Sequence, residues 1–264
     1  MLNDITLDIY YLTHMQTYLF KDHFLELKSR LGRVIFTFII TFIICYYYKD
    51  SIYNLLLQPL ADLDIGYNRK VIYTGLTEAF FTYLKLAAFG ASMITIPVLA
   101  VQIYFFLKPG LYENEKLIAA FILLLSPVLF WSSSILVFYL VMPKAWSFFL
   151  SFESGDNLIP IVLEARISEY LNLIIQLVFA FGLSFQLPLL LVVMNLMKIV
   201  TVEGLKKKRR LAIVINFIIA GILTPPDIIS QFALAIPLIL LYEISIIMCK
   251  FVENRGPHAR HTMD

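Results

Sequence analysis

Charged residues are scarce in this chain of 264 residues: Asp, Glu, Lys and Arg together make up 15% of it, whereas 60% is hydrophobic and the mean hydropathy is +0.81. A soluble globular protein is about a quarter charged and about half apolar. One core of this size cannot hold such an apolar excess, so most of it must face lipid. Because a spanning helix takes roughly 20 residues, about five to seven spans fit and a large soluble domain is excluded.

Cysteine and histidine are equally scarce, and their positions exclude several kinds of site. The two cysteines, Cys45 and Cys249, lie in apolar runs, which is neither a disulfide framework nor a zinc pattern, and a bond between them requires two helix ends to meet. A haem subunit needs axial histidines inside its bundle, and an intramembrane metalloprotease needs His-Glu-x-x-His. The four histidines instead lie near the termini: His14, His23, His258 and His261. We therefore expect no metal and no cofactor.

Six apolar runs predict an all-α integral membrane protein with six transmembrane helices in a single domain over residues 1–264. The runs cover about 31–48, 79–107, 117–142, 167–197, 211–223 and 228–249. An amphipathic segment, 15–30, precedes them, and a short tail, 250–264, follows.

The last two runs are separated by Thr224, Pro225, Pro226 and Asp227. Two adjacent prolines and an acid do not fit the middle of a helix in hydrocarbon. They predict a tight turn between antiparallel helices, with Thr224 as the cap and Pro225 in the first helical turn. The fifth span is then short, about 20 Å by its number of residues.

The basic residues predict the orientation. If the six runs all cross, 15 of the 21 Lys and Arg residues lie on the side of the termini, five lie on the other side, and Lys85 falls within the second run. Since cytoplasmic loops carry the excess of Lys and Arg, both termini are expected in the cytoplasm or its organellar equivalent. On the outer side, residues from Asp50 to Leu60 have helical spacing and reach Pro59, which predicts a short helix on the membrane surface.

Four prolines fall within the apolar runs: Pro97, Pro127, Pro188 and Pro237. A proline removes one backbone hydrogen bond and bends a helix. Several kinked helices favour a curved wall or a glove-like bundle over a straight one. The alternative is that these prolines have no such role, because proline is common in membrane helices.

Polar residues inside the runs are candidates for function. Glu243 lies in the last run, where a carboxylate is costly and usually functional. Alternatively, it is protonated and hydrogen-bonded to a neighbouring helix. Gln186, close to Pro188, either meets a partner or bonds another helix of the same chain. These residues alone do not distinguish a receptor from a channel or from a proton-coupled carrier of small solutes that uses Glu243.

The expected cytoplasmic face carries acids among its bases. Glu26 precedes the first span and can form an i,i+4 pair with Arg30. Glu113 and Glu115 occupy the loop before the third run, where a helix dipole also favours acids. The basic block 206–210 fits a topological signal, with contact to anionic lipid as the alternative.

Several segments together resemble the TatC family, the multispanning subunit of the twin-arginine (Sec-independent) protein translocase. They occur in the family's order along nearly the whole chain. The most telling are His23-Phe-Leu-Glu-Leu-Lys-Ser-Arg-Leu31, Phe106-x-x-Pro-Gly-Leu-Tyr-x-x-Glu115, Phe181-Gly-Leu-Ser-Phe-Gln-Leu-Pro188 and Leu223-Thr-Pro-Pro-Asp227.

The resemblance implies a receptor, not an enzyme. Such a protein binds twin-arginine signal peptides and recruits TatA-like and TatB-like single-span partners, so that folded proteins cross an energy-transducing membrane on the proton-motive force. The implied partners include membrane lipid and other subunits of an oligomeric complex, but no nucleic acid. By resemblance, the signal-peptide residues are Glu26, Lys28, Phe106, Pro109 and Glu115, and the partner-helix residues are Gln186, Thr224 and Glu243.

Two positions depart from the pattern of the family. Gln186 stands where many bacterial members carry Glu, so it can form hydrogen bonds but cannot titrate. Lys28 stands where the motif has Arg and keeps the charge. The many Phe, Tyr, Ile and Asn residues suggest an AT-rich gene, so the membrane is a bacterial plasma membrane, or a mitochondrial inner or thylakoid membrane if the gene is organellar.

Overall fold

Helices make up all the regular structure in the part of the chain that the computed structural model describes, which is residues 2–62, 70–154, 162–223 and 228–255. Side chains are not described for residues 2–23, 114, 115, 223, 229, 230, 233, 252, 254 and 255. The helices are α1 (Leu2–Tyr47), α2 (Lys49–Ala61), α3 (Glu78–Leu107), η1 (Lys108–Gly110), α4 (Glu113–Leu136), η2 (Val137–Val141), α5 (Met142–Leu150), α6 (Ile167–Ser184), α7 (Leu187–Leu196), α8 (Val202–Lys207), α9 (Arg209–Leu223) and α10 (Ile228–Arg255).

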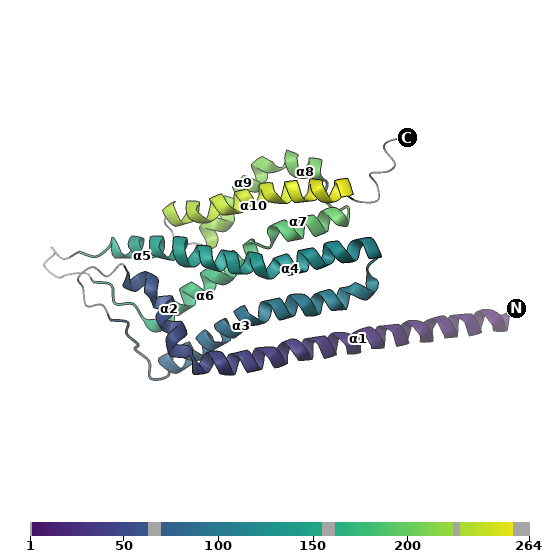
Figure 1. The fold of residues 1–264 in the computed structure, drawn as a ribbon, viewed down its shortest axis with the longest axis horizontal. Helices are drawn as coiled ribbons and strands as arrows, with labels where there is room; N and C mark the ends of the chain where they lie inside the picture. Colours follow the sequence, from purple (N-terminus) through teal and green to yellow (C-terminus); the bar gives the residue numbers. More distant parts are fainter. Residues whose placement is uncertain (1, 63–69, 155–161, 224–227, 256–264) are drawn as a thin grey trace.

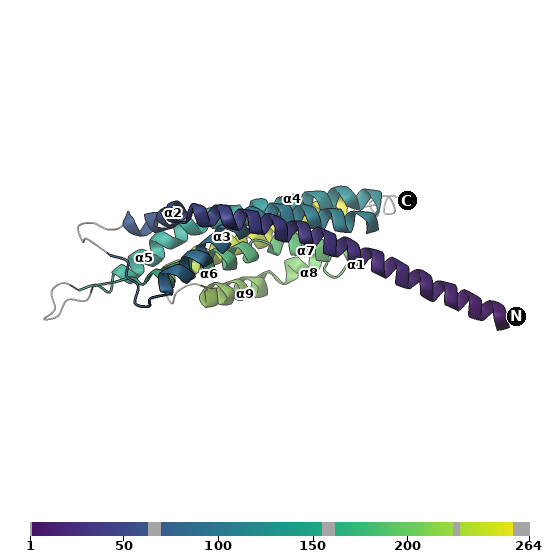
Figure 2. The same cartoon turned by 90° about the horizontal axis from the view of Figure 1, so that it is seen from below.

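The long helices lie side by side along the length of the molecule (Figure 1). α1 packs on α3, α3 on α4, α4 on α6, and α10 on both α7 and α9. α2 and α5 gather at one end, which we call the α2 end. The turn between α3 and α4 lies at the other end, called the turn end, together with the start of α1 and the end of α10. Seen from below, α9 lies on one side of the layer formed by the longer helices (Figure 2).

Five helical stretches are long and apolar enough to cross a membrane: Phe24–Tyr47, Glu78–Gly110, Lys116–Leu150, Ile167–Leu196 and Leu234–Phe251. The predicted fifth span, 211–223, corresponds to α9, which has 15 residues. At 1.5 Å per residue it is roughly 22 Å long, whereas the hydrocarbon core is about 30 Å thick. Length and composition thus support five of the six predicted spans.

The predicted boundaries agree best for α3 and α2, and less well for the runs that continue into further helix. α3 differs from the predicted 79–107 by one residue, and α2 covers the predicted surface helix with Pro59 buried near its end. The run 117–142 continues to Leu150, through the π-helical segment η2 and α5. α10 also continues beyond the predicted 249, to Arg255, so the predicted tail begins as helix.

The prolines do not all act alike. Helix continues through Pro97, Pro127 and Pro237. The run 167–197 is instead divided, because α6 ends at Ser184 and α7 begins at Leu187, so that Pro188 falls in the first turn of a new helix. Proline fits that turn, because the N–H groups of the first turn have no acceptor within the helix and the missing N–H of proline therefore costs no helical hydrogen bond.

The main core contains side chains of α2, α3, α4, η2, α5, α6, α9 and α10. Its fully buried members include Leu86, Val137, Ile174, Phe181 and Leu238. Cys45 and Cys249 are both buried and free, so the described structure contains no bond between them. The apolar side chains that remain exposed belong largely to the spanning helices, where lipid rather than water is the solvent.

Candidate functional site

Glu26 lies on α1 and forms the predicted pair with Arg30, one helical turn further on. Arg30 donates to Glu26 Oε1 from Nε at 3.1 Å and also from Nη2. The Glu26 side chain is 32% exposed and that of Arg30 is 17% exposed. The carboxylate is therefore accessible, yet it already holds a guanidinium of its own chain.

Arg30 also connects this carboxylate to the end of α3. Its guanidinium carbon lies 5.8 Å from the centre of the Phe105 ring, which is the geometry of a cation–π contact. The next residue, Phe106, is half-buried, and Pro109 is exposed in the single turn η1. The structure thus brings Glu26 and the Phe106–Pro109 motif to the same end of the molecule.

The acids of the α3–α4 loop begin α4. Glu113 Oε1 accepts a hydrogen bond from Lys116 Nζ at 2.6 Å. This bond and the positive charges of Lys116 and Lys108 hold the pKa of Glu113 below its usual value. Glu115 belongs to the same first turn, but its side chain is outside the described part. Lys28, on α1, is exposed.

Gln186 bonds other helices of the same chain, which was one of the two alternatives for it. Its Oε1 accepts from Ser126 Oγ on α4 at 2.8 Å, and its Nε2 donates to the carbonyl oxygens of Ser126 at 3.2 Å and Gly182 at 3.3 Å. The amide lies at the break between α6 and α7, and its hydrogen bonds to Ser126 connect this break to α4.

The apolar neighbours of Glu243 in the sequence suggested that it is buried in the interior, but the structure places it at the surface of the helix bundle. Its side chain is 42% exposed, and Oε2 accepts from Arg209 Nη2 at 2.8 Å. Arg209 begins α9, which packs along α10, so the basic start of the short helix lies level with Glu243. The partner is thus a cation rather than a neutral hydrogen-bonding group.

The predicted turn residues Thr224, Pro225, Pro226 and Asp227 lie outside the described residues. On either side of them, α9 and α10 are joined by contacts that the structure describes. Gln231 Nε2 donates to the Phe217 carbonyl oxygen at 3.2 Å, and the Phe217 and Phe232 rings meet edge to face with centroids 5.1 Å apart. These contacts agree with an antiparallel pair of helices.

A polar cluster near the α2 end was not predicted from the sequence. Glu78 Oε2 accepts from the backbone N–H groups of Thr74 and Gly75 and from Arg166 Nη2, and Oε1 accepts from Ser168 Oγ at 2.5 Å. Beside this cluster, Ile72 and Arg166 form a short parallel β-bridge. The only hint in the sequence is an acid at the start of an apolar run, which any helix dipole also favours.

Helices of spanning length, packed around an apolar core, define a polytopic all-helical membrane protein. The described residues hold no group of three His, Cys, Asp or Glu side chains that could bind a metal ion.

Comparison with known proteins identifies the family. Residues 22–237 match the family TatC, the Sec-independent protein translocase protein. Over 251 residues the chain is 62% identical to the Sec-independent protein translocase protein TatC of Rickettsia prowazekii, covering 95% of this chain and 100% of that protein. It is 38% identical to the tatC-like protein ymf16 of Reclinomonas americana, covering 88% of this chain and 87% of that protein.

A solved structure agrees with the sequence matches. The crystal structure of a twin arginine translocase receptor TatC is similar with a TM-score of 0.69 and 32% identity, and the match covers 88% of this chain and 99% of that chain. The chain belongs to the TatC family. It is a membrane-embedded subunit of the Sec-independent, twin-arginine protein translocase, and thus a component of transport rather than a member of a known enzyme family.

Proposed function

We propose that this subunit is the signal-peptide receptor of the translocase and that Glu26 and Glu115 receive the two arginines of the signal. The observation that supports this most directly is the position of Glu26. Its carboxylate is about one-third exposed and is linked through Arg30 to Phe105, beside the Phe106–Pro109 motif. Residues from two motifs 80 positions apart therefore share one end of the molecule.

The chemistry of a carboxylate explains a preference for arginine. A guanidinium presents a planar fork of donors that matches a carboxylate in bidentate geometry, whereas the lysine ammonium is a point charge. Arg30 already binds Glu26 through two donors, although Nε and Nη2 both donate to the single oxygen Oε1 rather than one to each oxygen. An incoming arginine of the signal peptide either displaces Arg30 or shares the carboxylate with it, while Lys28, Phe106 and Pro109 form the rest of the surface.

We further propose the six-span topology for the single domain, 1–264, with both termini in the cytoplasm. Two observations support it: the excess of basic residues on one side, and the start of α1 lying at the same end as the end of α10. α9 then crosses as the short fifth span, in a locally thinned bilayer or sheltered by neighbouring helices.

TatA-like and TatB-like partners are proposed to dock along α7, α9 and α10, near Gln186, Thr224 and Glu243, in an oligomeric complex driven by the proton-motive force. Glu243 supports this because its exposed, paired carboxylate can exchange hydrogen bonds with a polar residue of a partner helix. Gln186 must release Ser126 or Gly182 to do the same. A proton-coupled carrier is less favoured, because Glu243 is half-exposed and ion-paired.

Binding of synthetic signal peptides to the purified full chain tests the receptor proposal. The twin-arginine peptide should bind more tightly than its twin-lysine version. A hydrogen bond to a charged group contributes about 1.5–3 kcal/mol. Glu26→Gln or Glu115→Gln should therefore lower the affinity for the twin-arginine peptide by roughly ten- to a hundredfold, so that it no longer binds more tightly than the twin-lysine peptide.

Glu113→Gln is the matched control, since it removes an acid from the same turn of α4 as Glu115 and should leave the preference for arginine unchanged. Thermal unfolding of each variant in detergent separates loss of binding from loss of fold. Equal affinity of the unsubstituted chain for the two peptides contradicts the proposal.

A further inference from the structure

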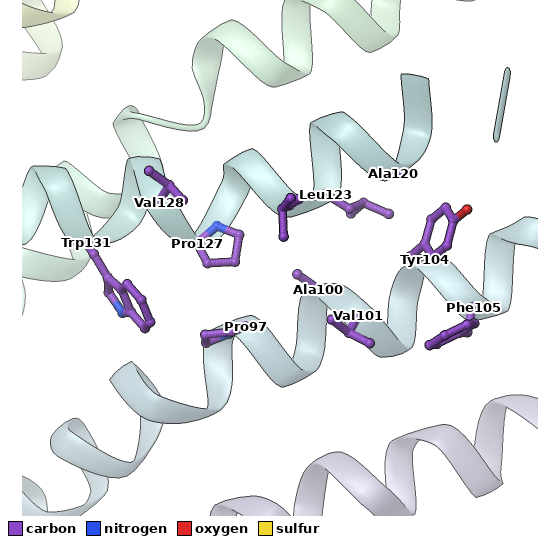
Figure 3. A pocket seen from close by; sticks show the side chains of 11 residues that line it. Pro97, Ala100, Val101, Tyr104, Phe105, Ala120, Leu123, Pro127, Val128 and Trp131 are labelled. Carbon is purple, nitrogen blue, oxygen red and sulfur yellow. The ribbon is translucent and has the colours of Figure 1, made fainter. Parts of the chain in front are cut away.

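An apolar groove of about 400 Å³ runs between α3 and α4. Figure 3 shows its two walls. Pro97, Ala100 and Tyr104 of α3 face Ala120, Pro127 and Trp131 of α4 across it. Its size lies within the range of pockets that bind small apolar ligands, roughly 300–1,000 Å³. The groove opens from within a spanning segment, so its surroundings are lipid.

The two ends of the groove differ. At one end, Trp131 Nε1 donates to the main-chain oxygen of Met93 at 3.1 Å, which ties α4 directly to α3. The other end reaches Tyr104 and Ala120, near the turn end of the molecule. Lys108 follows Tyr104 by four residues and Lys116 precedes Ala120 by four, so each lysine is one helical turn beyond the groove.

The shape and chemistry of the walls select the occupant. A helix is about 10 Å wide with its side chains, so it can rest over the opening of a groove between two packed helices but does not fill the space inside. An extended peptide has backbone N–H and C=O groups that need partners in the absence of water, and the walls are almost entirely apolar, with the Trp131 N–H already donating to Met93. Water is not stable in an apolar cavity.

An acyl chain has no hydrogen-bonding groups and is narrow enough to lie between the helices. We propose that this groove binds one acyl chain of an anionic phospholipid, whose phosphate lies at the turn end beside Lys108. The exposed Lys108 supplies the charge that complements the phosphate, whereas Lys116 Nζ already donates to Glu113 Oε1 at 2.6 Å. The Tyr104 hydroxyl adds a polar group at the same end of the groove.

This lipid site shares the α3–α4 turn with the proposed signal-peptide surface, because Lys108 and Pro109 belong to the same turn η1 and the groove residue Phe105 contacts Arg30. Lipid binding itself requires neither a peptide nor a partner.

Trp131 provides the reporter for a direct test. The chain has two tryptophans, so Trp146→Phe leaves Trp131 as the single one. This protein is reconstituted into phosphatidylcholine vesicles that contain the same small mole fraction of bromine-labelled lipid, either phosphatidylglycerol or phosphatidylcholine. Bromine on an acyl chain quenches tryptophan fluorescence on contact. We expect the labelled phosphatidylglycerol to quench Trp131 at least twofold more strongly than the labelled phosphatidylcholine.

Three variants locate the site. Lys108→Gln should lower quenching by phosphatidylglycerol towards the phosphatidylcholine level. Lys144→Gln, which removes an exposed lysine of α5 at the α2 end, should not. Ala120→Phe fills the groove and should abolish the difference between the two lipids. Lys108 is exposed, so its variant tests the proposal even if Ala120→Phe does not fold.

Equal quenching by the two lipids in the parent protein would show ordinary bulk lipid contact and overturn the proposal.

Discussion

Gly182 of α6 lies directly against the ring of Phe130 of α4. A Cβ added at Gly182 would be 2.3 Å from ring carbon Cε2, a distance that side chains essentially never adopt. Both residues are buried, and Phe181 beside Gly182 is fully buried as well. The two helices approach here as closely as the absence of a side chain allows, as small residues permit in membrane bundles.

Gly182→Ala should therefore destabilise the protein. Forcing a methyl group into a packed core costs about 1–3 kcal/mol, and the expected readout is a lower midpoint of thermal unfolding in detergent. Gly32→Ala is the matched control, since a Cβ there meets nothing within 4 Å and alanine favours helix over glycine. Equal midpoints for the two variants contradict the close packing at Gly182.

Trp131 satisfies an acceptor that Pro97 leaves without its helical donor. In an α-helix the N–H of residue 97 bonds the carbonyl of Met93, but proline has no N–H, and Trp131 Nε1 donates there instead. Trp131→Phe should lower the free energy of unfolding by about 1–3 kcal/mol because this carbonyl loses its partner. Adding Pro97→Ala restores a donor within α3 and should recover part of the loss.

Measured unfolding midpoints of the two single variants and of the double variant form the test. The expected pattern is a non-additive cycle, in which Trp131→Phe costs less with alanine at 97 than with proline. If Trp131→Phe costs the same with alanine at position 97 as with proline, Trp131 does not replace the backbone donor that Pro97 lacks.

The Arg209–Glu243 pair predicts how Glu243 variants behave. Glu243 lies in the spanning stretch Leu234–Phe251, where lipid surrounds the exposed part of a side chain and an unpaired charge is costly. Glu243→Gln keeps a hydrogen-bond acceptor for Arg209, so it should lower stability less than Glu243→Leu does and should keep transport and the co-purification of single-span partners. Glu243→Leu should reduce that co-purification. Complete loss of transport in the Gln variant would instead favour a titrating acid.

Glu78 should be important for the α2 end of the molecule. Its carboxylate accepts from two backbone N–H groups, a serine hydroxyl and Arg166, and its side chain is only 10% exposed. Glu78→Ala leaves these donors without their carboxylate acceptor and should lower the midpoint of thermal unfolding. The matched control is Glu169→Ala, because Glu169 also pairs with Arg166, at 3.2 Å, but is 69% exposed. A lower unfolding midpoint for Glu78→Ala alone is the expected outcome.

Clearly bounded apolar runs and local pairs were predictable from the sequence. α3 was placed within one residue because charged residues, Glu78 and Lys108, mark the two ends of its apolar run, and the Glu26–Arg30 pair follows from i,i+4 spacing alone.

The break before Pro188 was not predicted. The same sequence pattern, a proline within an apolar run, occurs at Pro97, Pro127 and Pro237, where the helix is continuous, so the pattern does not distinguish the two cases.

Contacts between distant segments could not be read from periodicity. Ser126 is 60 residues from Gln186, and Arg209 is 34 residues from Glu243. The apolar neighbours of Glu243 indicated burial, since the sequence does not show that a second helix brings a guanidinium beside it. The same reason hid Glu78, whose partner Arg166 is 88 residues away.

The hydrogen bonds at the α2 end, between residues 72–74 and 165–167, also set an order of events during synthesis. Ile72 bonds Ala165 and Ile167 through backbone groups, and Arg166 Nη2 donates to Thr74 Oγ1 at 2.6 Å, across 92 residues. A nascent chain that ends before residue 165 contains α1, α3 and α4 but none of these partners. The segment ahead of α3 must therefore wait until the later segment is made, and contacts so distant in sequence form late. The first half of the molecule can insert early, yet the α2 end becomes complete only when α6 begins.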